Sequence, residues 1–322
     1  MARKSYSPAD LKKIRTYSVS ARAHKVHLPQ VARLPEAGAS AADLLAAMPD
    51  FLGVRELRAV VDKVAAAHRA DRPVVMAMGA HVVKVGCAPI VIDLMRRGIV
   101  RALVFNGATA IHDAELATLG ATSEEVADTI RDGTFGMVAE TMELFTAVCA
   151  LAESEALGLG AAAGRLLVER SAPHAELSML AMAHRFGVPV TVHVALGTDT
   201  IHMADGVDGA RLGAASIRDF KLLCSIVADL GATPADGAGG VWLNIGSAVV
   251  LPEVFLKAVS VARNLGASLD AMVTANFDMQ RHYRPKLNVV TRPVKAGNGH
   301  EVIGHHEILL PLLRQAIIEK LA

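Results

Sequence analysis

The sequence has few of the residues that would place it in several common classes of protein. Only three cysteines, Cys87, Cys149 and Cys224, occur among its 322 residues, and they stand far apart in apolar surroundings. This number and spacing exclude a disulfide framework and a CxxC metal knuckle, and they are typical of a reducing cytoplasm. Aromatic residues make up 4% of the chain, which disfavours an aromatic-rich β-sandwich.

An excess of charge of one sign and long apolar runs are also missing. The chain has 33 Lys and Arg residues against 32 Asp and Glu residues, so its net charge is +1. This balance creates no long-range field that would draw the protein to nucleic acid or to an anionic membrane. No uncharged apolar run reaches about 18 residues, and the basic start lacks the apolar core of a signal peptide. We therefore expect a cytoplasmic protein with no nucleic-acid or membrane partner, which binds small molecules and copies of itself.

What the chain does have is a regular alternation of apolar runs and helical patterns. Apolar runs that end in or beside Gly or Asn occupy residues 73–79, 100–107, 188–197, 240–247 and 269–277. Helical patterns that separate them include residues 54–70, 89–98, 110–120, 216–231 and 251–266. This alternation predicts an α/β fold, a Rossmann-like parallel sheet with helices on both faces. Residues 123–173 contain no clear strand, so we expect a helical insertion there.

Two parts of the chain differ in composition. Residues 1–40 are polar and basic at first, and Ser7 followed by Pro8 predicts a short capped helix before an irregular arm. Residues 41–322 contain no linker and no repeat, which indicates one large domain. The arm and the apolar composition favour buried interfaces, so we expect a homo-oligomer in which the arm packs on a neighbouring subunit.

Ligands of an open parallel sheet collect outside the carboxyl ends of the strands, where loops and helix N-termini converge. That rule selects the loops 79–86, 106–115, 196–206 and 246–252 and the stretch after Phe277. In the first loop, backbone N–H groups between Gly79 and Gly86 would hold a phosphate with help from Lys84, or the glycines merely permit a turn. The spacing matches neither GxGxxG nor a P-loop.

The loop after Asn106 carries acids at the start of a helix. His112, Asp113 and Glu115 stand there. Acids in this position either satisfy the helix N-terminus or, as Asp113 or Glu115 would, hold a ribose hydroxyl or a cationic substrate.

The loop 196–206 is denser in polar residues than a turn requires. It holds Thr198, Asp199 and His202, directly after a strand that contains His193. We predict a ligand role for Asp199 or His202, whereas His193 is also compatible with a satisfied core histidine.

One stretch, 300-HEVIGHHE-307, has the composition of a metal site but not its spacing. The pattern is not HExxH, and Gly304 interrupts any helix that would align two histidines. We therefore predict no metal. A serine hydrolase is also disfavoured, because no GxSxG elbow is present.

The order of these motifs resembles the deoxyhypusine synthase family from about residue 70 to the C-terminus. GAHVVKVGCAPIVIDLMRRGIVRALVFNGATAIHDAELA is similar to the family's strand–helix–strand, which ends in a Thr-Ala-Gly-Gly loop followed by acids. VPVTVHVALGTDTI is similar to its Pro-Ala-Leu-Thr-Asp segment, and GGVWLNIGSAVV to its Leu-Gly-Gly-Gly-Val loop. TANFD and EILLPLLRQAI resemble its Thr-Ala-Gln-Glu-Phe-Asp and its closing helix. A bacterial subgroup of the same core, with RTYSVSARAHKV near its start, is also similar.

The resemblance implies a Rossmann-like fold with NAD bound between subunits of a tetramer. In that family an aminobutyl group is oxidised off spermidine, carried on a lysine as an imine and passed to a protein lysine. Position by position, the resemblance implies NAD contacts from Gly79, Gly86, Asn106, Gly107, Ala108, Thr198, Asp199 and Asp278.

The chain departs from the family's pattern in two places. Val250, Leu251 and Pro252 stand where the family has a catalytic histidine, and MQRHYRPKLNVVTRPVK replaces its Trp-Gly-Lys segment. Counting back from the closing helix puts Lys295 near the family's lysine, with Lys286 as the other candidate. We assign Lys295 as nucleophile or base.

Cations stand where the family recognises a cation. The cations Arg281, Arg284, Lys286, Arg292 and Lys295 therefore predict an anionic ligand: a carboxylate, a phosphate or the cofactor's pyrophosphate. Arg281, Arg284 and Lys286 are the predicted substrate contacts, with Asp113 as a further one. A solvated basic loop, or ion pairs at a subunit interface, is the alternative interpretation.

The leading hypothesis is an NAD-dependent enzyme that dehydrogenates a small, possibly anionic substrate. His202 or His282 would serve as its acid or base. One alternative is a nucleotide-binding or scaffolding protein that has lost catalysis. Another is a polyamine aminobutyl transferase of the homospermidine synthase or deoxyhypusine synthase type, which the arginines disfavour.

Overall fold

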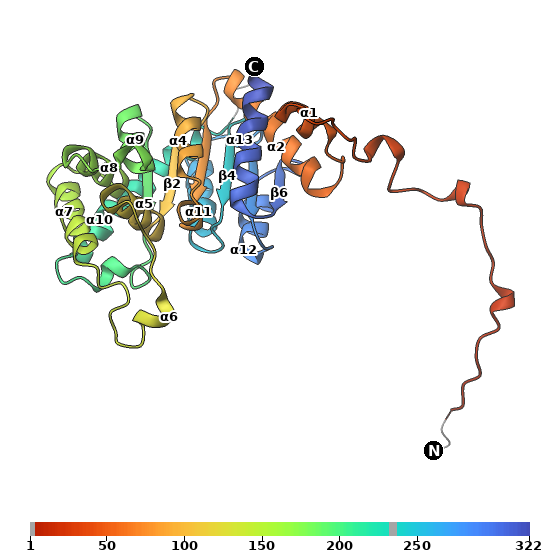
Figure 1. Ribbon diagram of the computed structural model, residues 1–322, viewed down its shortest axis with the longest axis horizontal. Helices are drawn as coiled ribbons and strands as arrows, with labels where there is room; N and C mark the ends of the chain where they lie inside the picture. The colour runs from red at the N-terminus through yellow and green to blue at the C-terminus, as the bar shows by residue number, and fades with distance from the viewer. Residues whose placement is uncertain (1–3, 232–236) are drawn as a thin grey trace.

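The computed structural model describes residues 4–231 and 237–322. In these residues six parallel strands form one sheet in the order β3-β2-β1-β4-β5-β6 (Figure 1). The strands are β1 Val74–Met78, β2 Ala102–Asn106, β3 Val190–His193, β4 Val241–Ile245, β5 Val273–Asp278 and β6 Gly299–Ile303. This is the strand order of a doubly wound Rossmann fold, so the predicted α/β class is confirmed.

The order of the strands reverses at the middle of the sheet. Met76 of β1 lies opposite Leu103 of β2 on one side and opposite Leu243 of β4 on the other. From β1 the chain first adds β2 and β3 on one side, and then crosses over to add the remaining strands on the other. The boundary between β1 and β4 is therefore the switch point, outside which such sheets bind ligands.

Helices cover both faces because alternate strand residues point to opposite sides. Met76 and Leu103 belong to one apolar cluster, which includes side chains of α2 (Leu52–Arg69), α4 (Ala88–Arg96) and α13 (His306–Leu321). Val75 and Val104 belong to the other, with α10 (Gly209–Ala228) and α11 (Val250–Asn264). A short helix, α1 (Ala41–Ala47), precedes α2. The sheet is thus buried on both faces, as its continuous apolar strands require.

Between β2 and β3 the chain forms the predicted helical insertion. After α5 (Gly107–Leu119) come α6 (Val126–Thr129), α7 (Ala139–Ser154), α8 (Leu159–Glu169) and α9 (Met179–Phe186). Figure 1 shows these helices gathered at the β3 side of the sheet. In the described part of the chain no single helix is long and apolar enough to cross a membrane. The two helices α7 and α8 meet that test only as a pair, which is bent by 114°.

Two segments differ from the sequence-based prediction. Residues Gly299–Ile303 form the edge strand β6, which is half-buried, with His300 and Val302 inward. The prediction missed it because an edge strand lacks the continuous apolar run of a central one. The helix predicted at Pro8 does not form, and only a 3-10 turn, Leu11–Lys13, follows the capping side chain of Asp10.

A buried carboxylate, Asp219, joins the insertion to the sheet. Its Oδ2 accepts hydrogen bonds from the backbone N–H of Val192 in β3, at 2.9 Å, and of Gly160 in α8, at 3.1 Å. Burial raises the pKa of Asp219 to about 7 against the opposing effect of these hydrogen bonds. The group therefore takes up a proton in the folded protein at a pH where the unfolded chain has lost it.

We expect Asp219 to make the folded state less stable as the pH rises. Its folded pKa lies above the ordinary value of 3.8, so its stabilising contribution is complete below that value and is lost as the pH rises through about 7. Asn does not titrate. The free energy of unfolding of Asp219→Asn should therefore rise relative to the native protein between about pH 4 and pH 8, by up to about 4 kcal/mol.

Urea unfolding of both proteins at the two pH values measures this difference. Asp128→Asn, at an exposed aspartate in α6, is the control and should show the pH dependence of the native protein. If Asp219→Asn also followed the native pH dependence, the raised pKa would be refuted.

Candidate functional site

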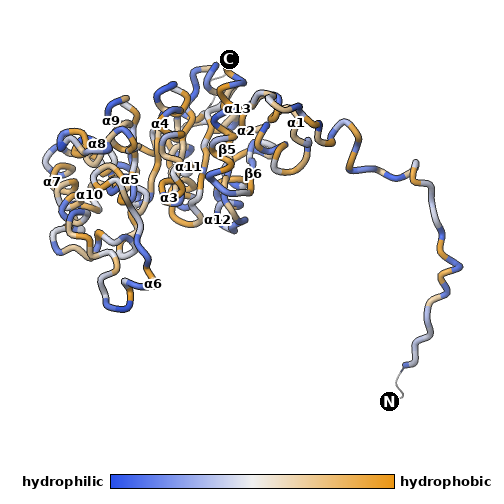
Figure 2. The backbone as a smooth tube through the Cα atoms, viewed as in Figure 1, coloured by the Kyte–Doolittle hydropathy of each residue, from blue (hydrophilic) through white to orange (hydrophobic). Residues whose placement is uncertain are grey.

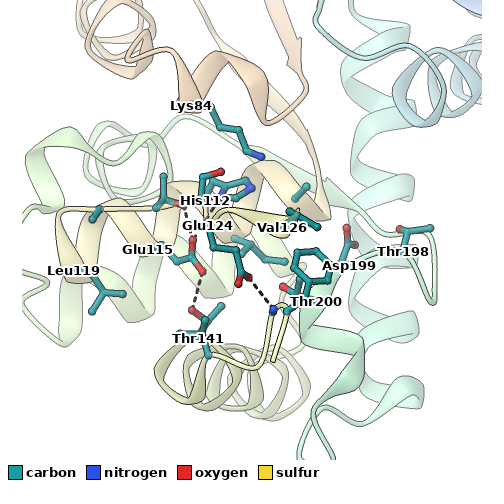
Figure 3. Close-up of a pocket in the computed structure, with 18 residues that line it drawn as sticks. Lys84, His112, Glu115, Leu119, Glu124, Val126, Thr141, Thr198, Asp199 and Thr200 are labelled. Atoms are coloured by element: carbon teal, nitrogen blue, oxygen red, sulfur yellow. Dashed lines mark hydrogen bonds and ion pairs between the residues drawn. The ribbon is translucent and has the colours of Figure 1, made fainter. Parts of the chain in front are cut away.

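A cavity of about 420 Å³ lies at the carboxyl edge of the sheet, beside the ends of β2 and β3. Its walls come from α3 (His81–Lys84), α5, the segment 121–138, the first turn of α7 and the loop after β3. The volume is in the range of small-molecule sites. Figure 3 shows Glu115 and Thr141 on one side and Asp199 on the other. The lining includes the predicted cofactor residues Ala108, Thr198 and Asp199, and it adds Lys84, His112, Glu115, Glu124 and Thr141.

Glu115 is held in place on the cavity wall. Its Oε1 accepts a hydrogen bond from Thr141 Oγ1 at 2.9 Å, and its Oε2 accepts one from Thr122 Oγ1. His112 Nδ1 lies 3.5 Å from the same Oε2 and 2.6 Å from the Thr122 hydroxyl. Burial alone would raise the pKa of Glu115, but the hydrogen bonds outweigh it and hold the pKa below its usual value. The site therefore contains a fixed negative charge.

The segment 121–138 forms part of the cavity wall and adds a second carboxylate. Glu124 Oε1 accepts a hydrogen bond from the backbone N–H of Gly136 at 2.8 Å, which ties the two ends of the segment together. Lys84 enters from α3 and is the one Lys or Arg among the described lining residues. Acidic side chains therefore outnumber basic ones in the cavity.

Asp199 and His202 form a pair after β3. His202 Nδ1 accepts hydrogen bonds from the backbone N–H of Gly197, at 3.1 Å, and of Asp199, at 3.2 Å. This acceptor role implies that the neutral ring carries its proton on Nε2, which lies 3.9 Å from Asp199 Oδ2. Both atoms are buried, and neither has a hydrogen-bond partner among the described residues. Burial raises the pKa of Asp199, and the nearby His202 acts in the opposite direction.

The absence of a side chain at Gly107 leaves room for this carboxylate. A Cβ on Gly107 would lie 2.0 Å from Asp199 Oδ2, so Asp199 rests against the N-terminus of α5, where a negative charge is favoured. Asn106 caps the same helix, because its Oδ1 accepts hydrogen bonds from the backbone N–H and the hydroxyl of Thr109, at 2.9 and 2.6 Å. The structure thus brings Asn106, Gly107 and Asp199 together, although the Asn106 oxygen is already used as a cap.

A second polar group lies at the ends of β4 and β5. Asp278 is buried at the end of β5, with Oδ1 3.7 Å from His282 Nε2. His306 at the start of α13 is buried too, and its Nε2 lies 3.3 Å from the carbonyl oxygen of Phe277. Its Nδ1 has no partner in residues 4–231 and 237–322, and its ring centroid is 5.3 Å from that of His81. This group flanks the switch point of the sheet.

Gly79 and Gly86 each have a structural explanation. A Cβ on Gly79 would lie 2.1 Å from the carbonyl oxygen of Gly246, so the loops after β1 and β4 touch there. Gly86 follows α3 with φ +73°, a left-handed conformation that glycine adopts without strain. Cofactor contacts from these two glycines remain a prediction.

Asp113 lies in the core and does not line the cavity. Its Oδ1 accepts from the backbone N–H of Met179, at 2.8 Å, and its Oδ2 from Ser178 Oγ and the N–H of Leu180, at 2.6 and 3.0 Å. The side chain therefore serves the N-terminus of α9. Of the two acids considered in this loop, Glu115 faces the cavity.

The structure does not bring Lys295 together with the other predicted catalytic residues. Lys295 precedes β6, and its Nζ lies 2.8 Å from Oδ2 of Asp270, which precedes β5. Both residues are at the amino edge of the parallel sheet. His202 and His282, in contrast, follow the carboxyl ends of β3 and β5.

The cations predicted to bind an anion are largely paired within the chain. Arg281 Nε lies 2.9 Å from Glu301 Oε2, and Arg284 Nε lies 3.5 Å from Glu253 Oε1, while Lys286 is exposed. This arrangement agrees with the alternative interpretation of an ion-paired basic loop.

Sequence reasoning missed Glu124, Thr141 and His306. The first two stand in the insertion, where only the folded path of the chain brings them to α5. His306 was weighed only as a metal ligand, and its place at the start of the helix after an edge strand was the available signal. No group of three or more His, Cys, Asp or Glu side chains in the described ranges is arranged to hold a metal ion.

The fold and the site define a Rossmann-like protein with a ligand-sized cavity at the carboxyl edge of its sheet. No protein-family model and no curated protein matches the sequence. The chain is similar to AgrE in its ternary complex with ornithine and NAD+, with a TM-score of 0.50 and 14% identity over 82% of this chain and 33% of that one. For an AgrE mutant bound to L-arginine, the TM-score is 0.51 and the identity 15% over 82% and 31% of the two chains.

A third structure is ArgZ, an arginine dihydrolase from the ornithine–ammonia cycle in cyanobacteria, with a TM-score of 0.48 and 13% identity over 84% and 34% of the chains. The chain thus spans about a third of the length of these structures. No family model matches, and the AgrE structures are not deoxyhypusine synthases, so the family assignment drawn from the motifs is not supported. At such identities the likeness shows the fold alone, which is the Rossmann-like fold that the sequence predicted.

Proposed function

We propose that this protein is a dinucleotide-linked enzyme that oxidises a small amine held in the cavity. The observation that carries the proposal is the pair of Asp199 and His202. Asp199 Oδ2 and His202 Nε2 have no hydrogen-bond partner in the described residues, and Asp199 lines a cavity at the carboxyl edge of a Rossmann-like sheet. A buried carboxylate whose pKa is raised, as that of Asp199 is, is typical of an active site when it lines a cavity.

The cofactor class rests on the fold and on the residues at the switch point. AgrE, which shares the fold, has been solved with ornithine and NAD+. In this chain the Gly79 and Gly246 backbones meet at the switch point, where dinucleotides bind in such sheets. The loops after β1 and β4 would hold the dinucleotide, with His306 Nδ1 as an unused hydrogen-bond acceptor. The bound nicotinamide supplies a hydride acceptor.

The substrate class follows from the charges of the cavity. Three carboxylates, those of Glu115, Glu124 and Asp199, line the cavity together with Lys84 and His112, and the hydrogen bonds to Glu115 keep it ionised. Carboxylates in a partly enclosed site bind ammonium groups through charge-assisted hydrogen bonds. A cationic amine therefore fits this cavity better than the anion expected from the sequence.

Oxidation of an amine removes a hydride from carbon and a proton from the neighbouring nitrogen. Asp199 is suited to take the proton, because burial raises its pKa and makes the carboxylate a stronger base. The Nε2–H of His202 makes no hydrogen bond in the described residues, and Nε2 lies 3.9 Å from Oδ2 of Asp199. We assign His202 as the positioning residue for Asp199.

Calorimetric titration with NAD+ and NADP+ tests the cofactor, and a panel of small amines then tests the substrate. The proposal expects micromolar dinucleotide binding and dinucleotide reduction with at least one amine. Charge reversal in Glu124→Lys should weaken the affinity for that amine roughly tenfold, since one charge-assisted contact contributes about 1.5 kcal/mol.

Asp128→Lys is the matched control, because it makes the same change of charge in the same segment at a residue that does not line the cavity. It should leave amine affinity within about twofold. Absence of dinucleotide binding would overturn the proposed function. Equal losses in the two variants would show that the amine does not bind beside Glu124.

A further inference from the structure

Residues 4–29 of the chain lie outside the packed body of the molecule. Figure 1 shows this arm running far from the sheet and its helices. All of its described side chains are exposed. The hydrogen bonds and the ion pair of these described residues are made within the segment 10–31. Contacts with the body begin only at residue 30, where Gln30 accepts a hydrogen bond from the backbone N–H of Asp50 at 2.9 Å.

The arm carries exposed apolar side chains along its whole length. Figure 2 shows hydrophobic positions interspersed with hydrophilic ones along it. Large apolar or tyrosine side chains occur from one end to the other, and each is at least 62% exposed: Tyr6, Leu11, Ile14, Tyr17, Val19, Val26 and Leu28. Repeated exposure of large apolar side chains along one segment is the feature that burial against a partner would remove.

The charge of the arm is opposite to that of the rest of the chain. Residues 1–40 hold eight of the 33 Lys and Arg residues but two of the 32 Asp and Glu residues, so their net charge is +6. The other 282 residues hold 25 basic and 30 acidic residues, a net charge of −5. The rest of the chain is therefore opposite in net charge to the N-terminal segment that includes the arm, whereas two arms repel each other.

An apolar groove lies next to the base of the arm. It has a volume of about 310 Å³ and is formed by α1, α2 and α13, with Leu45, Met48, Val54, Leu57 and Val61 among its lining residues. The arm is anchored on the same helix α1, because the backbone N–H of Arg33 donates to the carbonyl oxygen of Ala47 at 2.9 Å. An extended segment of 26 residues reaches roughly 85 Å, enough to cross a neighbouring copy.

We propose that the arm packs on a second copy of this chain, with its apolar side chains seated in that copy's groove formed by α1, α2 and α13. Because groove and anchor are adjacent, two copies can exchange arms reciprocally, and the exchange closes as a two-fold dimer. The opposite charges of arm and body add an attraction that weakens with salt. This inference does not depend on the proposed catalytic function.

Sedimentation equilibrium of the full-length protein and of a chain without residues 1–27 tests the role of the arm. The full-length protein should be a dimer or a multiple of it, and the truncated chain should fall to half that mass or less with an unchanged circular dichroism spectrum. A monomeric full-length protein, or a truncated chain of unchanged assembly, would overturn the proposal.

Two further variants test the groove. Val54→Lys places a charge in the groove and should lower the dimer affinity at least tenfold. Leu265→Lys makes a comparable change at a residue that is 79% exposed beyond α11, and should leave assembly unchanged. Equal assembly of both variants would overturn the groove as the docking site.

Disulfide trapping separates exchange between copies from folding back within one chain. Leu28→Cys in one preparation and Val54→Cys in another are mixed and oxidised, with little background because Cys87, Cys149 and Cys224 are buried. A covalent heterodimer is the expected product. If no heterodimer forms, and a single chain carrying both cysteines cross-links only to itself, the arm occupies its own groove and the proposal is wrong.

Discussion

Replacing Asp199 by Asn is expected to reduce amine turnover by a factor of roughly 10²–10⁴, the usual contribution of a general base. The change keeps the size of the side chain and removes only its ability to take up a proton. Asp199 Oδ2 has no hydrogen-bond partner among the described residues, so the loss of charge breaks no contact of that atom with the fold. Turnover is measured as the appearance of reduced dinucleotide with the amine found by screening.

The pH dependence of the rate gives this prediction a second readout. A base acts in its deprotonated form, so the native kcat/KM should fall as the pH drops through the pKa of Asp199, which burial raises above its usual value. Asp199→Asn should lack this limb. A purely structural residue would lower the rate without changing the shape of the profile.

Asp205→Asn is the matched control, at an exposed aspartate a few residues later in the chain. It should keep native turnover and the native pH profile. If Asp199→Asn retained native turnover while the dinucleotide still bound, Asp199 would be excluded as the base and the proton acceptor would have to be sought elsewhere in the cavity.

The largest loss of stability is expected for Gly79→Ala, which should lower the free energy of unfolding by roughly 3 kcal/mol or more. The added Cβ would lie 2.1 Å from the carbonyl oxygen and 2.9 Å from the carbonyl carbon of Gly246. Both are backbone atoms of the sheet's central loops, so they cannot move away as the end of a flexible side chain would. Urea unfolding of the native and variant proteins measures the effect.

Gly213→Ala provides a matched control inside α10. No heavy atom lies within 4 Å of its added Cβ, so the substitution should be neutral or should stabilise the helix by about 0.5–1 kcal/mol. An unfolding midpoint for Gly79→Ala equal to that of the native protein would show that the loops after β1 and β4 are not in contact. It would also remove the structural explanation for a glycine at this position.

The apolar runs, and the glycines and asparagines that end them, were sufficient to predict most of the strands of the fold. The run that becomes β1 is apolar throughout, and those that become β2 and β4 are apolar apart from one Asn each, because both faces of the sheet are covered; Gly follows where each strand ends. The same pattern predicted the loop of Asp199 and His202 as a ligand site. The edge strand β6 was missed because it is buried on one face only, a pattern too short and too polar to stand out.

The positions of charged residues in the sequence did not indicate which of them line the cavity. Arg281 and Arg284 follow one another closely after β5, yet each lies beside a carboxylate from another element, Glu301 or Glu253. Asp113 stands in an acidic loop but points into the core, where it caps α9. The spacing of residues along the sequence does not show which residues of other elements form ion pairs or hydrogen bonds with a given side chain.

The sequence by itself determined the class of the fold, the carboxyl-edge loops and the composition of the arm, because these depend on local patterns of apolar residues, glycine and charge. Only the tertiary structure decided which polar groups share a cavity. Glu124 and Thr141 reach Glu115 and Asp199 because the insertion folds back over α5. Lys295 is excluded from that cavity, because a residue before a parallel strand lies at the opposite edge of the sheet from a residue after one.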